Sequence, residues 1–279
     1  MTVPTVSLPS GDEMSQVGFG TWNIAGEELR TALRAALDAG YTHVDTAEGY
    51  MNEAEIGEVI AEHDREDLFL TSKVLPKHLN YESVLASCEA TLDRLGTDYL
   101  DLYLIHWPNP AISVRETFEA LAKLRAEGAV RNVGVSNFST YQLDVARHVA
   151  DVPIAVNQIE LHPWFYREDL VAYCRETDTA IQASAPLART EILGDETLGE
   201  LAEEYDRTPA QVALRWIVEK GITPLPRSTS ADHIAENIDL FDWELSDEDH
   251  ERIDGLDRDE PVYDTGVRDW DDDVWGISQ

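Results

Sequence analysis

Residues 40–57 read GYTHVDTAEGYMNEAEIG and contain one complete unit of alternating secondary structure. The run 42–46 is short and rich in β-branched residues, which is typical of a buried strand. Residues 52–61 follow with apolar side chains at helical spacing. The strand ends on Asp45, a charged residue that is costly to bury unless it is paired. The segment therefore predicts a strand, a polar loop and a helix.

The same alternation recurs along the chain. Further β-like runs are expected at 17–22, 68–74, 100–106, 133–136, 156–159, 181–185 and 222–226. Helical patterns lie between them, at 28–39, 81–95, 114–127, 141–149 and 209–219, with an additional helix around 196–205. Strands that alternate with helices in this way close into a parallel barrel. We therefore predict an α/β fold, a single (β/α)8 TIM barrel that spans residues 16–256.

The two ends of the chain lie outside this alternation. Residues 6–8 and 13–15 flank Pro9-Ser10-Gly11-Asp12, which predicts a β-hairpin that plugs the bottom of the barrel. The tail 257–279 is acidic and irregular, and it carries Tyr263, Trp270 and Trp275. It is either a solvated extension or a loop that folds over the barrel mouth. No linker divides the chain, so residues 1–279 are expected to form one domain.

Charge is the most unusual feature of the composition. The chain has 55 acidic residues against 21 Lys and Arg, a formal net charge of −34. No basic patch is available for phosphate backbones, so nucleic-acid binding is disfavoured. Self-repulsion of this size opposes folding unless salt screens it. We interpret the composition as an adaptation to a salt-rich cytoplasm, the alternative being an ordinary acidic protein.

Several other classes are disfavoured. No apolar run is long enough to cross a bilayer, and the N-terminal residues lack the pattern of a secretory signal. The two cysteines, Cys88 and Cys174, fit a reducing cytoplasm better than a disulfide framework. His43 and His162 stand alone on separate strands, without the spacing of a metal site, and no metal is expected.

Polar residues stand where the predicted strands end, which is the edge of such a barrel that carries the chemistry. Asp45, Lys73 and His106 each end a strand, and Tyr50 follows in the loop after Asp45. A Lys–Asp pair would offset the cost of burial and would place an ammonium group near the phenol. An ammonium lowers the pKa of a phenol and makes it a proton donor or acceptor near neutrality. His106 is placed to polarise a carbonyl oxygen.

Taken alone, each of these four residues can be explained by a structural role instead of a catalytic one: a turn residue, packing at the rim, an ion pair or a core histidine. Their matching positions favour a shared catalytic site. Later strand ends continue the series with Ser136-Asn137, Gln158, Ser184 and Arg227.

Several motifs resemble those of the aldo-keto reductase family, which includes aldehyde, ketone and 2,5-diketogluconate reductases. Residues 40–57 resemble its first signature, RNVGVSNF (131–138) the second and LPRSTSADHIAEN (225–237) the third. The resemblance extends over residues 17–256. It implies a monomeric oxidoreductase that transfers a hydride between NAD(P)H and a carbonyl or alcohol substrate. It assigns Asp45, Tyr50, Lys73 and His106 to the catalytic tetrad, with Tyr50 as the general acid in reduction.

The cofactor is expected to bind without a Rossmann loop, because Gly18-Phe19-Gly20 lacks the third glycine of G-x-G-x-x-G. The resemblance implies a dinucleotide extended across the barrel mouth, its carboxamide held by Ser136, Asn137 and Gln158. The other expected cofactor-binding residues are Thr21, Trp22, Asp45, Ser184, Pro186, Leu187, Arg227, Ser228, Thr229, His233, Glu236 and Asn237.

Three of these positions depart from the family pattern. Ser184 stands where a stacking tyrosine is common, Arg227 replaces a lysine, and His233 replaces an arginine. NADP(H) is preferred, because the guanidinium of Arg227 can meet the 2′-phosphate in a bidentate manner. NAD(H) is the alternative, since one cation is missing.

The expected substrate-binding residues are mostly aromatic: Trp22, Tyr50, His106, Trp107 and Trp275. Such a pocket suits small aldehydes, ketones or sugar-derived carbonyls. Two alternatives stay open, a nicotinamide-binding regulatory or interaction protein with little turnover and an unrelated barrel lyase or hydrolase. The polar strand ends argue for catalysis, although a fold alone does not determine function.

Overall fold

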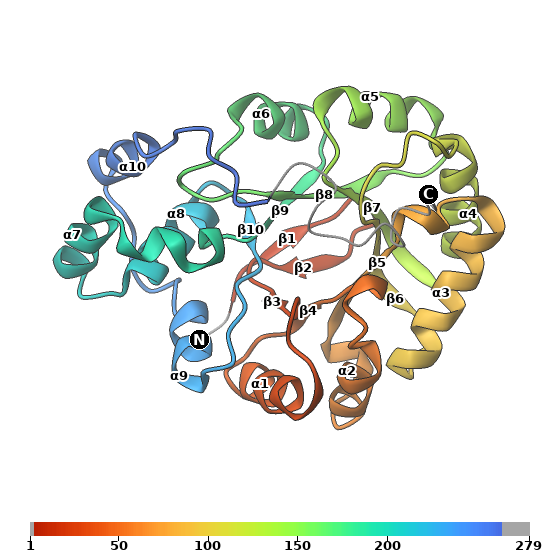
Figure 1. Ribbon diagram of the computed structural model, residues 1–279, viewed down its shortest axis with the longest axis horizontal. Coiled ribbons are helices and arrows are strands. Elements are labelled where there is room, and N and C mark those ends of the chain that lie inside the picture. Colours follow the sequence, from red (N-terminus) through yellow and green to blue (C-terminus); the bar gives the residue numbers. More distant parts are fainter. Residues whose placement is uncertain (1–2, 264–279) are drawn as a thin grey trace, which may run out of the picture.

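Eight parallel strands form one curved sheet in the computed structural model, which describes residues 3–263 (Figure 1). Each strand pairs with the next along the chain, from β3 to β10. The strands are β3 (Phe19–Gly20), β4 (His43–Asp45), β5 (Phe69–Val74), β6 (Leu100–Ile105), β7 (Val130–Ser136), β8 (Ile154–Glu160), β9 (Ala180–Ser184) and β10 (Thr223–Pro224). All eight lie at the predicted places, although β3 and β10 are shorter than expected.

The first and last strands of this sheet meet and close it. The amide of Gly18 donates to the carbonyl of Pro224 at 3.1 Å, and the amide of Gly20 donates to that of Pro226 at 3.0 Å. A Cβ atom at Gly20 would lie 2.9 Å from the carbonyl oxygen of Leu225, so a side chain there would force the strands apart. The predicted barrel is confirmed.

Ten α-helices surround the strands in the described part of the chain (Figure 1). They are α1 (Gly26–Asp38), α2 (Glu53–Ile60), α3 (Tyr81–Leu95), α4 (Val114–Ala126), α5 (Thr140–Val149), α6 (Glu168–Glu176), α7 (Glu196–Tyr205), α8 (Pro209–Glu219), α9 (Ala231–Ile238) and α10 (Asp247–Asp254). Their apolar faces pack on the outside of the sheet in one continuous core.

Helices α6, α9 and α10 were not among the helices that the sequence pattern predicted. Of these, α6 lacks a clear sequence signal for its start. Its N-cap residue Arg167 has a left-handed φ of 60° and provides no side-chain cap. The usual N-terminal signal of Ser, Thr, Asp or Asn is therefore missing. By contrast, α3 and α8 have the predicted limits, with side-chain caps from Asn80 and Thr208.

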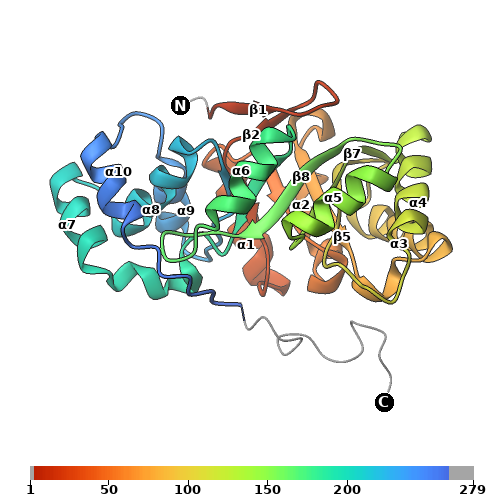
Figure 2. The ribbon, with the colours of Figure 1, turned by 90° about the horizontal axis from the view of Figure 1, so that it is seen from above.

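The predicted N-terminal hairpin is confirmed, as β1 (Thr5–Ser7) paired with β2 (Glu13–Ser15). Leu8 and Met14 of the hairpin are buried against Leu102 and neighbouring residues inside the barrel. Figure 2 shows the hairpin at one end of the molecule and the last described residues at the other. Val262 and Tyr263, at the end of the described chain, contact Glu160, the last residue of β8, so the end without the hairpin is the one at which the parallel strands terminate.

No helix in the described part of the chain has the length and apolar character needed to span a membrane.

Candidate active site

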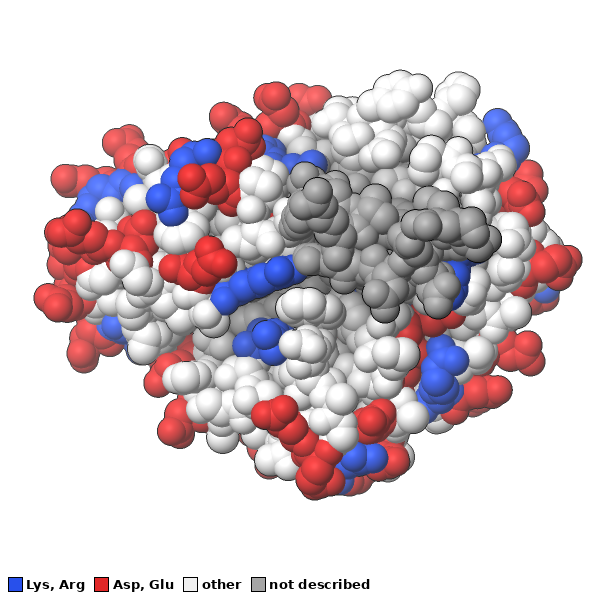
Figure 3. All heavy atoms as spheres, viewed as in Figure 1, with Lys and Arg blue, Asp and Glu red and all other residues white. Residues whose placement is uncertain are grey.

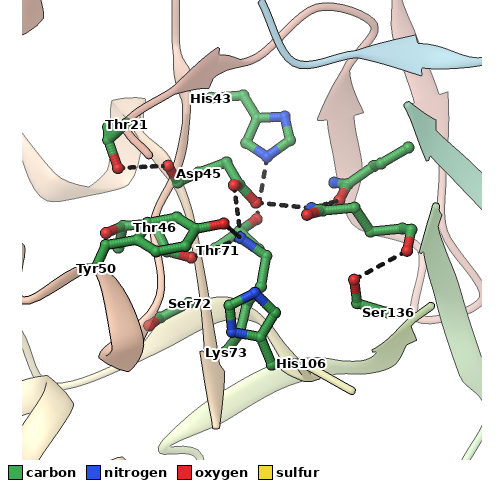
Figure 4. A network of polar contacts seen from close by, with 12 residues as sticks. Thr21, His43, Asp45, Thr46, Tyr50, Thr71, Ser72, Lys73, His106 and Ser136 are labelled. Carbon is green, nitrogen blue, oxygen red and sulfur yellow. Dashed lines mark hydrogen bonds and ion pairs between the residues drawn. The ribbon is translucent and has the colours of Figure 1, made fainter. Parts of the chain in front are cut away.

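Lys73 is the centre of the polar contacts at the mouth of the barrel. It lies on β5 and is fully buried. Its Nζ donates to Oδ1 of Asp45 at 2.6 Å, to the carbonyl of Thr46 at 2.9 Å and to Oη of Tyr50 at 3.2 Å (Figure 4). An ammonium group has three donors, and these contacts use all of them. The phenol oxygen of Tyr50 therefore accepts from Lys73, and its own proton is left to be donated elsewhere.

His106 completes the predicted tetrad. It follows β6, and its ring lies edge-on to that of Tyr50 with the centroids 5.6 Å apart. The four residues come from the ends of three neighbouring strands and one loop, and Figure 4 shows them around a common point. The structure thus brings together the four side chains that the strand-end pattern selected.

Burial controls the ionisation of this site. It raises the pKa of Tyr50 well above 10.0, and the charge of Asp45 raises it further. Burial likewise lowers the pKa of Lys73, although Asp45 opposes that shift. The expectation that Lys73 would lower the phenol pKa towards neutrality was wrong, because the loss of solvent outweighs the ammonium group that Asp45 already pairs.

His106 is also shifted by its surroundings. Burial lowers its pKa well below 6.5, and the charge of Lys73 lowers it further. Near pH 7 the imidazole and the phenol are both neutral. Each can donate a hydrogen bond to a carbonyl oxygen, which is the requirement for polarising that group.

The second oxygen of Asp45 is held from the opposite side of the barrel. Nε2 of Gln158 donates to it at 2.8 Å and also donates to Oε1 of Gln182 at 2.8 Å. Thr21, another predicted residue, donates through Oγ1 to the backbone carbonyl of Asp45 at 2.9 Å. Gln182 was missed by the sequence analysis, although a glutamine within the apolar run IQAS is a signal that could have identified it.

Ser136 and Asn137 lie beside Gln158, as their predicted shared role requires. Oγ of Ser136 donates to the carbonyl of Gln158 at 2.9 Å, and Nδ2 of Asn137 donates to Ser136 and to the carbonyl of His106, both at 3.0 Å. Asn137 has a left-handed φ of 63°. This arrangement places amide and hydroxyl groups at the ends of β7 and β8, next to the tetrad.

Two arginines flank the indole of Trp22 at the mouth. The guanidinium of Arg227 lies 5.4 Å from the ring centroid and that of Arg189 lies 5.1 Å from it. Acidic side chains crowd the periphery of this face, whereas a few basic side chains lie nearer its middle (Figure 3). Arg189 was missed, although an arginine soon after a strand end is conspicuous in a chain with so few basic residues. The pair suits an anionic group.

The remaining residues that the sequence analysis predicted to bind the cofactor lie around β9, β10 and α9. Pro186 is buried and Leu187 is half-buried after β9. Ser228 and Thr229 precede α9, on which His233 is exposed, Glu236 half-buried and Asn237 buried. The predicted residues thus form a surface from β9 to α9 rather than one enclosed pocket.

The beginning of the C-terminal tail crosses the mouth. The amides of Val262 and Tyr263 donate to the buried carboxylate of Glu160, the second at 3.0 Å. The ring of Tyr263 lies 6.5 Å from that of Trp107, and its side chain hydrogen-bonds Ser184. Tyr263 therefore adds an aromatic group close to Trp107. The predicted Trp270 and Trp275 lie outside the described residues.

Among residues 3–263, no group of three or more His, Cys, Asp or Glu side chains is arranged to hold a metal ion.

Comparison with known proteins agrees with this geometry. The model of the aldo/keto reductase family matches residues 16–258. The glyoxal reductase of Bacillus subtilis is 41% identical over 261 residues, which cover 92% of this chain and 94% of that protein. The 2,5-diketo-D-gluconic acid reductase B of a Corynebacterium is 40% identical over 260 residues, with coverage of 92% and 94%. The structure of a Bombyx mori aldo-keto reductase in complex with NADP superposes with a TM-score of 0.90, at 33% identity and 98% coverage of both chains.

Proposed function

The chain belongs to the aldo/keto reductase family, and on that premise we propose that Tyr50 is the proton donor in an NADP(H)-dependent reduction of small carbonyl compounds. The protein is an oxidoreductase that transfers a hydride between NAD(P)H and a carbonyl or alcohol substrate. The observation that carries the role of Tyr50 is the set of three contacts made by Lys73. Because Lys73 donates to the phenol oxygen, the phenol proton is directed to another acceptor.

The carbonyl oxygen of the substrate would accept from Tyr50 and from the neutral imidazole of His106. Two donors at that oxygen stabilise the negative charge that develops there during reduction. Asp45 holds Lys73 in place, and Gln158 in turn holds Asp45. The protein thus contributes positioning and electrostatics to the reaction.

NADP(H) is the preferred cofactor, with NAD(H) as the alternative. The residues at the mouth fit a dinucleotide, because amide and hydroxyl groups of Ser136, Asn137 and Gln158 lie beside the tetrad while Arg189 and Arg227 lie further out. When bound, the nicotinamide supplies or accepts the hydride. Arg227 would meet the 2′-phosphate, and Trp22, Pro186 and Leu187 would lie along the rest of the cofactor.

The substrate would lie between Trp22, Trp107 and the tetrad. Aromatic walls with two hydrogen-bond donors suit aldehydes, ketones and sugar-derived carbonyls. We further propose that the protein is a monomer with one domain in a salt-rich cytoplasm. Nucleic-acid and membrane partners are not part of this proposal. The net charge of −34 supports this setting.

The test is loss of absorbance of NADPH and of NADH with a panel of carbonyl compounds, in dilute and in molar salt. Turnover by the wild type, and none by Tyr50→Phe with cofactor affinity unchanged, is the expected result. Turnover by Tyr50→Phe at the wild-type rate would refute the role of Tyr50. Cofactor binding without turnover by the wild type would favour a regulatory protein on the same barrel.

A further inference from the structure

We propose that Glu48 is a positioning residue that holds Tyr50 at the correct distance from Lys73. The inference rests on the proposed function, since it concerns the same proton donor. Glu48 begins the short 3-10 turn η1 (Glu48–Tyr50), two residues before Tyr50. Its carboxylate is mostly buried, with a side-chain exposure of 14%.

One oxygen of Glu48 bridges the turn to the strand that carries Lys73. The amide of Leu75 donates to Oε2 of Glu48 at 3.0 Å. Leu75 immediately follows β5 and lies two residues after Lys73. The carboxylate therefore connects the backbone segments of the two residues whose side chains meet at 3.2 Å.

The other oxygen of Glu48 is held by two further elements. Nδ1 of His78, in the 3-10 turn η3 (Pro76–His78), lies 2.8 Å from Oε1, and Oγ of Ser87 on α3 lies 3.4 Å from it. Oγ of Ser87 also lies 3.1 Å from Nδ1 of His78. A carboxylate with three partners on separate elements has a well-defined position.

Tyr50 needs such support because its turn is only three residues long. The turn ends at Met51, which has a left-handed φ of 54° and is 86% exposed. Beyond it, Asn52 fixes the chain by accepting from Thr46 and by donating to the carbonyls of Thr21 and Ile24. Asn52 thus anchors the end of the loop, whereas Glu48 is the anchor towards β5.

Loss of this anchor should affect the chemical step more than binding. The Tyr50–Lys73 contact is the longest of the three that Lys73 makes. A shift of about 1 Å in a reacting group can reduce a rate by up to about a hundredfold. Cofactor contacts expected from Ser136, Asn137 and Arg227 come from other loops and would stay intact.

The experiment compares Glu48→Ala, Glu48→Asp and Glu48→Gln with a matched control, Glu116→Ala. Glu116 is also half-buried and accepts a backbone amide, that of Tyr81 at 3.0 Å, but within the described residues it forms no hydrogen bond to η1 or β5. Glu48→Ala should lower kcat about tenfold or more, while the Kd for NADPH is unchanged. Glu48→Gln should keep most of kcat, because its amide oxygen still accepts from Leu75. Glu116→Ala should keep the wild-type kcat.

Glu48→Asp retains the charge but withdraws the carboxylate by one methylene, so it should lower kcat while the protein stays folded. It decides the matter if Glu48→Ala does not fold. Wild-type kcat in both Glu48→Ala and Glu48→Asp would overturn the inference and leave the proposed function intact. An equal loss in Glu116→Ala would also overturn it, since the effect would then be one of general stability.

Hydrogen exchange separates this inference from the proposed function. Amides in residues 46–51 should exchange faster in Glu48→Ala than in the wild type, whether or not any substrate is turned over. Absence of turnover in the wild type would reject the proposed function alone. Unchanged exchange in residues 46–51 would reject the anchoring role of Glu48.

Discussion

The Lys73–Asp45 pair at the barrel mouth and the Arg34–Glu62 pair on the surface are both ion pairs with a carboxylate, but they lie in opposite surroundings. Both have N–O distances of 2.6 Å, but the side chains of the first are 0% and 5% exposed and those of the second 42% and 48%. Water screens the surface pair, so it contributes little to folding. The buried pair interacts strongly. Removal of one partner leaves the other charge buried and unpaired, which destabilises the folded protein. Burial rather than ion-pair geometry therefore decides which charges control chemistry in this acidic protein.

Removing the cation of the buried pair should have the largest effect on both activity and stability. Lys73→Met should abolish measurable turnover and lower the free energy of unfolding by about 3–5 kcal/mol, because Asp45 stays buried without its partner. Denaturant unfolding and steady-state rates measure both effects. Adding Asp45→Asn should restore much of the stability and none of the activity. Wild-type turnover by Lys73→Met would contradict the assignment of this pair to the active site.

Removal of an exposed charge at the mouth should have an intermediate effect. Arg227→Ala should weaken the binding of NADPH about tenfold or more and that of NADH much less, because the charge-assisted contact with the 2′-phosphate is lost. Fluorescence titration with both cofactors measures it. Arg189→Ala is the matched control, since it removes the other guanidinium beside Trp22 and should weaken both cofactors alike. Equal losses in Arg227→Ala would disprove the 2′-phosphate role.

Loss of a single surface ion pair should change the stability little. The effect of the whole acidic surface on stability, by contrast, should depend on salt. The free energy of unfolding should rise from dilute buffer to molar salt, where the screening length falls to about 3 Å. Thermal unfolding over a salt series measures this dependence. Arg34→Met should shift the curve little at any salt concentration. A wild-type stability that does not change with salt would favour an ordinary acidic protein over a halophilic one.

Changes of pH in the neutral range should have the smallest effect on reduction. The active forms are the protonated phenol and the neutral imidazole. The raised pKa of Tyr50 means that the phenol proton is lost only above pH 10, and the lowered pKa of His106 means that the imidazole is protonated only well below pH 6.5. The kcat for reduction should therefore be flat between about pH 6.5 and 9. A pH–rate profile with an ionisation of the tetrad in that interval would show that water enters the site more than the burial of these residues implies.

Much of the candidate site could be predicted from the sequence, because all parallel strands of a barrel terminate at the same end. Asp45, Lys73 and His106 could be selected from their positions in the chain, and the structure brings them to Tyr50. Arg189, Gln182 and Glu48 could not be selected in this way. Their importance depends on partners that lie far away in the chain or across a loop, such as Trp22 for Arg189 and Leu75 for Glu48.

By itself, the sequence determined the order of the eight strands, most of the helices between them, the hairpin at the bottom of the barrel and the polar residues at the strand ends. These follow from local periodicity, β-branched runs and turn residues, which act over a few neighbouring positions. Only the tertiary structure decided the direction of the pKa shift of Tyr50, the arginine pair around Trp22 and the contact of the tail with Glu160. Those properties depend on how much water is excluded and on which distant groups meet, and neither is encoded in local spacing.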